Sequence, residues 1–129
     1  MTNQIRNKKG EVIFTYEEQH LNQVDLSRVN LREADLRAYD LSGAELAWAD
    51  LSDADLSEAN LSRATLSEAN LYKADLSDSD LSDVNFYGAT LSQANLYKAN
   101  LSRADLHGIK LDKEQLETFT NALGLIIKE

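Results

Sequence analysis

The sequence predicts a repeat solenoid, a closed tube of β structure built from one five-residue unit, and three observations support this. Leucine recurs every fifth residue from Leu21 to Leu111, and all 19 such positions are Leu except Phe86. A small apolar residue, usually Ala, stands two places before each of them. Asp or Asn usually stands one place before. A regular internal repeat of this kind decides the architecture before any single element is assigned.

A period of five fits neither of the common elements. Five residues turn an α-helix by about 500°, so leucines at this spacing would spiral around it without forming a stripe. A flat strand alternates its faces, so an odd period would send successive leucines to opposite sides. Both arrangements leave half of the leucines in water. The backbone must therefore bend once per repeat, so that every leucine points to a common axis.

The chemistry of each position in the repeat fits a narrow tube. The small inward position is Ala in 12 of its 18 occurrences, and pairing it with a large residue allows native packing density. Each buried Leu contributes about 1.5–3 kcal/mol, so the leucines form a core despite the short chain. Asp or Asn fills 14 of the 18 positions before the central residue. We expect these side chains to stabilise turns through local backbone bonds, with metal binding as the alternative.

The repeat resembles the Ala-Asp/Asn-Leu-X-X unit of the pentapeptide-repeat family, as in residues 54–58, Ala-Asp-Leu-Ser-Glu, and 59–63, Ala-Asn-Leu-Ser-Arg. The resemblance implies an all-β fold, a right-handed quadrilateral parallel β-helix with four repeats, or about 20 residues, per coil. On this model, residues 20 apart are stacked neighbours about 4.8 Å apart. One inner column would then contain Leu21, Leu41, Leu61, Leu81 and Leu101, and the next would contain Leu26, Leu46, Leu66, Phe86 and Leu106.

Residues 1–20 precede the repeat region, which spans residues 21–111, and predict a capping β-hairpin. Residues 11–16 are rich in β-branched and aromatic side chains, and residues 7–10, Asn-Lys-Lys-Gly, indicate a turn. An uncovered coil would offer unpaired backbone, so we expect the hairpin to close the N-terminal end. The bulky residues Val24, Val29 and Tyr39 replace Ala in the first coil, which fits incomplete closure there. A ligand pocket at Tyr39 is the alternative.

Residues 112–129 depart from the repeat and predict a short capping helix with a tail. Asp112 followed by Gln115 is a capping-box signature, and Gly124 is expected to end the helix. Leu116, Phe119 and Leu123 lie at helical spacing. We expect this segment to close the C-terminal end of the tube. Because the C-terminal element of some pentapeptide-repeat proteins also forms a dimer, the same three residues are our candidates for a homodimer contact.

The chain offers few residues for catalysis or cofactor chemistry. It has no Cys, and its two histidines are His20, at the entry to the repeat, and His107, which should point outward. No phosphate loop, zinc spacing or calcium loop is present in the sequence. We therefore expect no enzyme activity, no cofactor and no metal. The lack of Cys and of any long apolar run leads us to expect a cytoplasmic protein with no membrane segment.

The charge of the chain favours a basic partner over nucleic acid. The net charge is −9, with 15 acids and 8 bases in the repeat region. Nucleic-acid binders carry a basic face, so direct nucleic-acid binding is not expected. Stacking predicts an acidic strip formed by Glu33, Asp35, Asp53, Asp55 and Asp75, with Glu58 and Asp78 in the next column.

The acidic strip and two aromatic residues are the candidate partner-binding surfaces. The strip either binds a basic partner or is a solubilising face on which Lys73 and Lys98 offset the repulsion. Trp48 and Tyr87 are predicted to lie on one side of the tube, two coils apart, and both residue types are favoured in contact sites. Two exposed aromatic residues are also ordinary on a protein surface.

Two functions compete on this evidence. The first is a non-catalytic structural and protein-interaction module whose partner the sequence does not identify. The second comes from the resemblance, because some pentapeptide-repeat proteins mimic DNA, bind bacterial type II topoisomerases such as gyrase and protect against quinolones. Just under five coils extend roughly 23 Å, and duplex DNA of that length carries about 14 phosphate charges. The repeat region has a net charge of −7, since 15 acids oppose 8 bases, and a head-to-head dimer would double its length.

Overall fold

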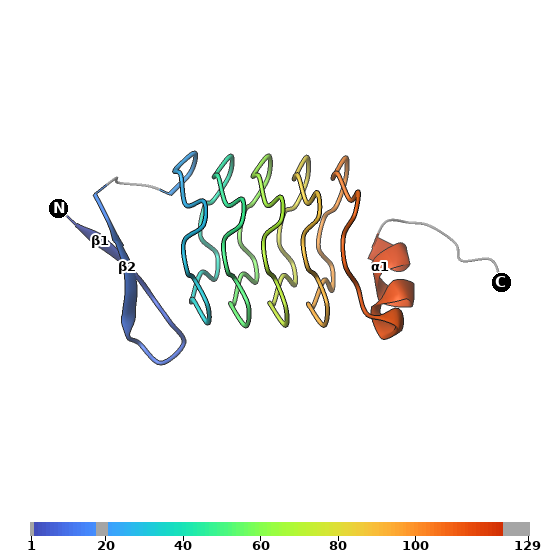
Figure 1. The fold of residues 1–129 in the computed structure, drawn as a ribbon, viewed down its shortest axis with the longest axis horizontal. Coiled ribbons are helices and arrows are strands. Elements are labelled where there is room, and N and C mark those ends of the chain that lie inside the picture. Colours follow the sequence, from blue (N-terminus) through green and yellow to red (C-terminus); the bar gives the residue numbers. More distant parts are fainter. Residues whose placement is uncertain (1, 18–20, 123–129) are drawn as a thin grey trace.

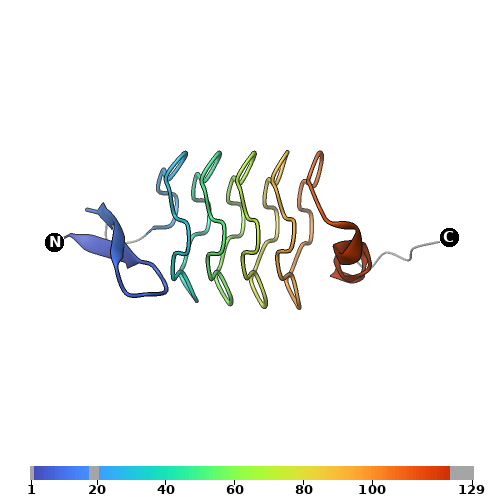
Figure 2. The same cartoon turned by 60° about the horizontal axis from the view of Figure 1, so that its bottom comes forward.

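The computed structural model describes residues 2–17 and 21–122 as an elongated stack of coils with a cap at each end (Figure 1). Two antiparallel strands, β1 (Asn3–Arg6) and β2 (Val12–Tyr16), come first. A 3₁₀ helix (Lys113–Gln115) and the helix α1 (Leu116–Ala122) follow the coils. Turning the molecule leaves the same order of hairpin, coils and helix along one axis (Figure 2). None of the described helices is both long enough and apolar enough to cross a bilayer.

The coils are joined by parallel bridges between residues that lie 20 apart in the sequence. These bridges run without interruption from Asp25↔Glu45 to Thr90↔Lys110, one for every repeat. Each position is hydrogen-bonded in both directions: Leu36 N donates to Asp55 O at 2.8 Å, and Asp55 N donates to Ala34 O at 2.9 Å. The backbone therefore completes one turn in four repeats. The predicted coil length and stacking register are confirmed.

The interior of the tube is filled by the two inward positions of each repeat. Every central residue from Leu21 to Leu101, including Phe86, is buried, and the alanines from Ala34 to Ala99 pack between them. One inward position is polar: Ser79 is buried, and its hydroxyl donates to Leu76 O at 2.6 Å. Towards the C-terminal end Leu106 and Leu111 are half-buried. The predicted large-and-small core is confirmed, and it loosens only where the stack ends.

Each repeat turns the corner through the two residues that follow its central leucine. In one example Ala34 N donates to Leu31 O at 3.0 Å, and the third residue of this turn, Glu33, has φ 61°. A positive φ at that place is typical of a type II turn, where glycine is preferred. Among the described residues 15 non-glycine residues adopt it, each at a cost of about 1 kcal/mol. The stacked hydrogen bonds and the buried core must hold these corners in place.

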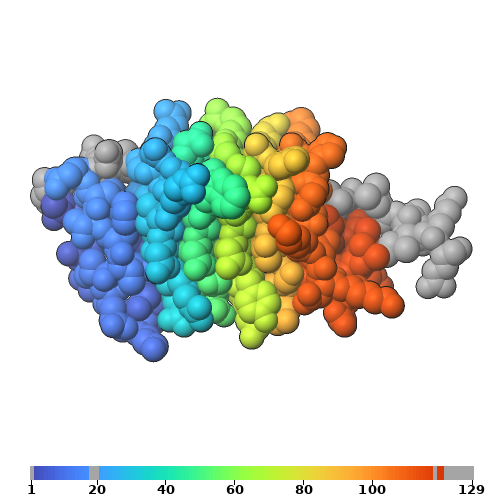
Figure 3. Space-filling view, viewed as in Figure 1, coloured from blue at the N-terminus to red at the C-terminus, as the bar shows by residue number. Residues whose placement is uncertain are grey.

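The N-terminal hairpin closes the first coil, as predicted. Asn7 Oδ1 accepts hydrogen bonds from Lys9 N and Glu11 N, both at 3.0 Å, which stabilises the predicted turn. The hairpin continues onto the coil: Asp35 N donates to Arg6 O at 2.8 Å, and Lys8 N donates to Glu33 O at 2.9 Å. Ile5 is completely buried against the core. The space-filling view shows the hairpin packed against the first coil (Figure 3).

The C-terminal cap begins with the predicted capping box, but a 3₁₀ turn precedes the α-helix. Asp112 N donates to Gln115 Oε1 at 2.8 Å, and α1 starts only at Leu116. Phe119 is 5% exposed and belongs to the core, whereas Leu116 is 48% exposed. The segment thus closes the C-terminal end through Phe119, while Leu116 faces solvent. Leu123 and Gly124 lie outside the described residues.

Candidate protein-interaction surface

The predicted acidic ladder exists as a column along one side of the tube. Parallel bridges place Asp35 next to Asp55 and Asp55 next to Asp75. Glu33 and Asp53 stand at the corner that precedes this side, each at the positive-φ position of its turn. All five carboxylates of the predicted strip are thus brought together along one side and its neighbouring corner.

Turn hydrogen bonds use one oxygen of most of these ladder carboxylates. Asp55 Oδ1 accepts from Ser57 N at 3.0 Å and from Ser57 Oγ at 2.6 Å. Asp75 makes the same pair of bonds with Ser77. The expectation that Asp and Asn stabilise the turns is confirmed at these positions. In the ladder these carboxylates are partly buried.

Two arginines, which the sequence prediction did not include, form ion pairs within the acidic strip. Arg37 Nε lies 2.9 Å from Asp35 Oδ1 and 3.8 Å from Asp55 Oδ2. The hydrogen bond from the Arg37 side chain is the main cause that lowers the pKa of the Asp35 carboxyl below its usual value, so Asp35 stays ionised in mild acid. A second ion pair joins Arg32 to Asp53, with 3.7 Å between a terminal guanidinium nitrogen and Asp53 Oδ2.

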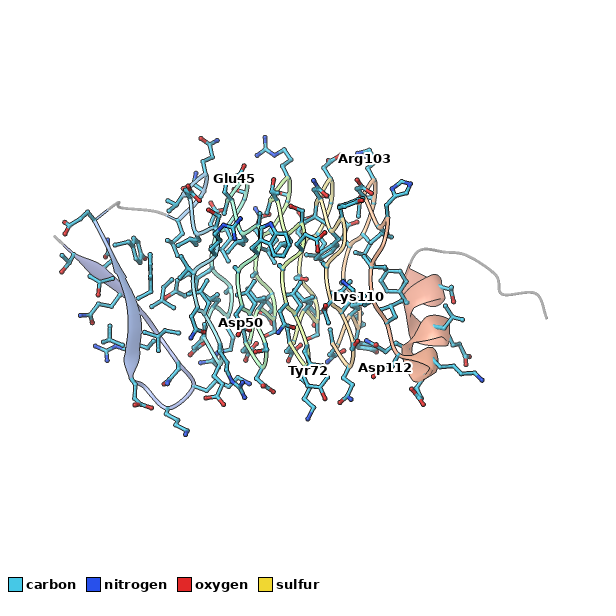
Figure 4. The ribbon with its side chains drawn as sticks, viewed as in Figure 1. Glu45, Asp50, Tyr72, Arg103, Lys110 and Asp112 are labelled. Atoms are coloured by element: carbon cyan, nitrogen blue, oxygen red, sulfur yellow. The ribbon has the colours of Figure 1, made fainter. Side chains whose placement is uncertain are left out.

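Lys73 and Lys98 stand over aromatic rings of their own repeats. Their ammonium groups are 5.3 Å from the Tyr72 ring centroid and 5.4 Å from the Tyr97 ring centroid. The ring in the preceding position attracts the cation. That these lysines also offset the repulsion of the acidic strip stays a prediction. Tyr72 and Arg103 point outward from opposite edges of the tube (Figure 4).

Trp48 and Tyr87 lie on one side of the tube, as predicted, and both are 54% exposed. Arg28, one coil before Trp48, places its guanidinium carbon 5.5 Å from the centroid of the tryptophan ring. Arg28 and Trp48 are 20 residues apart and therefore stacked, but the predicted surface did not include Arg28. Trp48 and Tyr87 are thus large exposed side chains on a side of the tube that also carries several carboxylates.

Tyr39 lines a hollow at the junction between the hairpin and the first coils. The hollow has a volume of about 550 Å³ and is polar. The surrounding side chains are Gln4, Arg6, Asp35, Arg37, Ser57 and Glu58. Tyr39 also packs, half-buried, against the core, as expected for an end coil that is not fully closed. Both predictions for Tyr39, packing at the tube end and lining a pocket, therefore describe part of its surroundings.

The remaining titratable groups of the described residues include an exposed histidine–aspartate pair and no metal-binding cluster. His107 points outward, as predicted, and its Nδ1 lies 2.6 Å from Asp105 Oδ1 in an exposed pair. That hydrogen bond is the main cause that lowers the pKa of the Asp105 carboxyl. Within residues 2–17 and 21–122, no group of three or more His, Cys, Asp or Glu could hold a metal ion. His20 lies outside the described residues.

A second hollow, of about 590 Å³, lies between the last coil and the C-terminal cap. Leu96 and Phe119 form its apolar part, and Gln93, Asn95, Asp112 and Glu114 contribute polar groups. Gln115 crosses it: its Nε2 donates to Leu91 O at 2.7 Å and to Ala94 O at 3.1 Å. The hollow is thus bridged by a structural hydrogen bond of the cap.

Comparison with protein families gives one match, to the family model described as pentapeptide repeats (8 copies). It covers residues 17–46, 44–83 and 79–113, which is most of the chain. No match was found among curated protein sequences.

Solved structures provide further similarities. A pentapeptide repeat protein from the Arabidopsis thaliana thylakoid lumen is 27% identical, with a TM-score of 0.69 over 80% of this chain and 75% of its own. Another, from the cyanobacterium Cyanothece 51142, is 32% identical, with a TM-score of 0.60 over 85% and 75%. A plasmid-mediated fluoroquinolone resistance protein is 20% identical, with a TM-score of 0.46 over 82% and 66%. That last likeness is too small to support a functional argument.

Proposed function

The chain belongs to the pentapeptide-repeat family, and on that basis we propose that it is a non-catalytic, cytoplasmic protein-interaction module. The observation that carries the proposal is the regular presentation of outward side chains on a continuous, closely packed core. Such a scaffold holds charged and aromatic groups at fixed positions with little loss of freedom on binding, which favours affinity. The right-handed quadrilateral form implied by the family resemblance belongs to the same proposal.

Four equivalent positions allow a sharp test of this function. Ser57, Ser67, Ser82 and Ser92 each follow a buried central residue, one on each side of the tube, and all are partly exposed. Replacing each in turn with a photo-crosslinking residue gives four matched probes for capture from a cell extract. We expect one protein to crosslink strongly from one side or from two adjacent sides. Equal labelling from all four sides, or tightly bound cofactor in the purified protein, would contradict the proposal.

A second candidate function, inhibition or protection of a bacterial type II topoisomerase by DNA mimicry, is favoured by the ladder of Asp35, Asp55 and Asp75. The salt bridges of Arg37 and Arg32 weaken this candidate, because they neutralise the ladder and its edge. A gyrase supercoiling assay, with and without a quinolone, tests it. Inhibition or protection near stoichiometric amounts, lost when the three aspartates become asparagine, would establish mimicry.

A homodimer through the C-terminal cap is part of the proposal for either function. Of the candidates that the structure describes, Leu116 fits such a contact, since it is exposed. Leu123, outside the described residues, stays a candidate. Phe119 is used inside the monomer and is a poor candidate for the contact. Sedimentation of the Leu116→Ser variant beside the unchanged chain would test the contact: a dimer that persists in the variant excludes Leu116.

A further inference from the structure

One corner of the tube carries a column of five residues of varied chemistry, each at the positive-φ position of its turn. In stacking order they are Arg28, Trp48, Glu68, Gly88 and Gly108. The order is set by backbone hydrogen bonds between successive coils. Trp48 N donates to Ser67 O at 3.0 Å, and Glu68 N donates to Tyr87 O at 2.7 Å. Glu68 is therefore one coil beyond Trp48 and one coil before Tyr87.

Glu68 lies over the bare Cα of Gly88. A β-carbon added to Gly88 would stand 2.5 Å from Glu68 Oε1 and 2.7 Å from its carboxyl carbon, so the carboxylate occupies the space that the missing side chain leaves. Gly88 is consequently buried and Glu68 is half-buried. Within the described part of the chain, the Glu68 carboxylate has no hydrogen bond and no ion pair. The ammonium of Lys110 lies nearby, because its Nζ donates to Gly88 O at 3.2 Å, but among the described residues it forms no ion pair with Glu68.

At the neighbouring corner a carboxylate in the equivalent turn position forms an ion pair within the chain. Asp83 occupies the equivalent turn position there, and Arg103 stacks one coil beyond it. Arg103 Nε and a terminal guanidinium nitrogen lie 2.9 Å from the two Asp83 oxygens. At the Glu68 corner the residue at the equivalent place is Gly88, which supplies no side chain. The guanidinium that pairs with Asp83 inside the chain has no counterpart at Glu68.

The two exposed aromatic residues flank Glu68. Trp48 and Tyr87 are separated along the axis by two coils, or about 10 Å, and the positions between them hold Ala47 and Ser67. Trp48 already accepts the guanidinium of Arg28 at 5.5 Å, so its ring is suited to such a group. The corner lies between Glu45 and Asp50, which are labelled in Figure 4.

We propose that Trp48, Glu68 and Tyr87 form a binding site for an arginine side chain of a partner protein. The carboxylate would pair with the guanidinium, and an aromatic ring would stack on it, a combination that suits arginine better than lysine. This side keeps an excess of carboxylates that is complementary to a basic partner, since Asp25, Glu45, Glu68 and Asp105 oppose Arg28 and Lys110, whose Nζ reaches Gly88 O. The proposal rests on the interaction function proposed above and names its surface and the chemistry of its partner.

A peptide titration tests the site directly, because Trp48 is the only tryptophan of the chain. The probe is acetyl-Gly-Arg-Gly-amide, and the readout is the single indole N–H signal in a nitrogen-15 correlation spectrum. We expect a saturable shift with this peptide and none with the citrulline analogue, which keeps the shape but lacks the charge. The lysine peptide should bind more weakly, since its ammonium is more strongly hydrated and does not stack.

Variants locate the effect. Glu68→Gln should weaken arginine-peptide binding about fivefold, the upper range for a partly exposed ion pair, and Tyr87→Leu should also weaken it. Glu58→Gln is the matched control, because Glu58 occupies the same turn position on another corner and should leave binding unchanged. All three changes face outward, and a circular dichroism spectrum checks the fold.

Three results would overturn the site: no indole shift with the arginine peptide, equal binding of the lysine peptide, or equal loss in Glu68→Gln and Glu58→Gln. Failure of the site and failure of the interaction function can be told apart with the four crosslinking positions. If a partner crosslinks from another side and the arginine peptide does not bind, the arginine site is wrong but the interaction function is supported. If the arginine peptide binds but no protein crosslinks from any side, the proposed interaction with a partner protein is contradicted.

Discussion

The middle coils and the two ends of the tube are held together in different ways. In the middle, every inward residue is covered by a coil on both sides, as Leu61 is by the coils of Leu41 and Leu81. At the ends, one face of the stack must be covered by an element of different sequence. Ile5 of the hairpin and Phe119 of the C-terminal helix fill that role, each as a single buried side chain.

This difference shows that only the middle repeats are supported by packing against a coil on both sides. A solenoid is stabilised by contacts between neighbouring repeats, so a middle repeat is supported twice and a terminal repeat once. The half-buried Leu106 and Leu111 illustrate the second case. The caps therefore decide whether the last coils stay closed, and the core decides whether the tube forms.

The largest expected effect is a cavity in the middle. Leu61→Ala removes a side chain that is completely buried, and we expect the free energy of unfolding to fall by about 3–5 kcal/mol. Leu106→Ala, in the half-buried end coil, should cost clearly less because solvent already reaches that position. Denaturant unfolding of both variants measures the difference. Equal losses would show that the ends are packed as tightly as the middle.

The next effect is a break in the C-terminal cap. Phe119→Ala should lower stability by about 3 kcal/mol, the low end for a buried phenylalanine, because one side of the ring faces the hollow at the cap. We also expect amide hydrogen exchange to accelerate first in residues 92–111 and last in the middle coils. Uniform acceleration along the whole tube would mean that the solenoid unfolds as one unit and that the ends are not separately held.

A smaller effect tests the polar part of the same cap. Gln115→Ala removes the two bonds from Nε2 to Leu91 O and Ala94 O and the bond accepted from Asp112 N. We expect a loss of about 1–2 kcal/mol, measured by thermal unfolding. Glu114→Ala, an exposed change in the same 3₁₀ turn, is the control and should be nearly neutral. A similar loss in the control would show that the loss is not specific to these three hydrogen bonds.

The smallest effect concerns the corners of the coils. Ala38 is exposed and has φ 60°, so Ala38→Gly should relieve backbone strain and raise stability by about 0.5 kcal/mol. Ala47→Gly is the matched control, because Ala47 stands at the other corner position and is not among the positive-φ residues. This variant should be less stable than the unchanged protein. A loss in both variants would show that the corners are not strained. Chemical unfolding resolves the sign.

Much of the candidate surface followed from the repeat, and some of it did not. The alignment of Asp35, Asp55 and Asp75, and that of Trp48 with Tyr87, were predicted because stacking depends only on a separation of 20 residues. Glu68 was missed, since its carboxylate becomes notable only next to the bare Gly88. The signal was available: a glycine 20 residues after a long side chain offers it a place to lie.

The sequence by itself determined the coil length, the inward and outward positions and the presence of both caps. A solenoid is nearly one-dimensional, so each residue's neighbours follow from counting along the chain. Only the tertiary structure decided that Arg37 pairs with Asp35 and Asp55, that Lys73 turns to Tyr72, and that Phe119 faces inward. Long side chains at a corner have several partners within reach, and one turn of 3₁₀ helix rotates every residue after it, so counting cannot settle either choice.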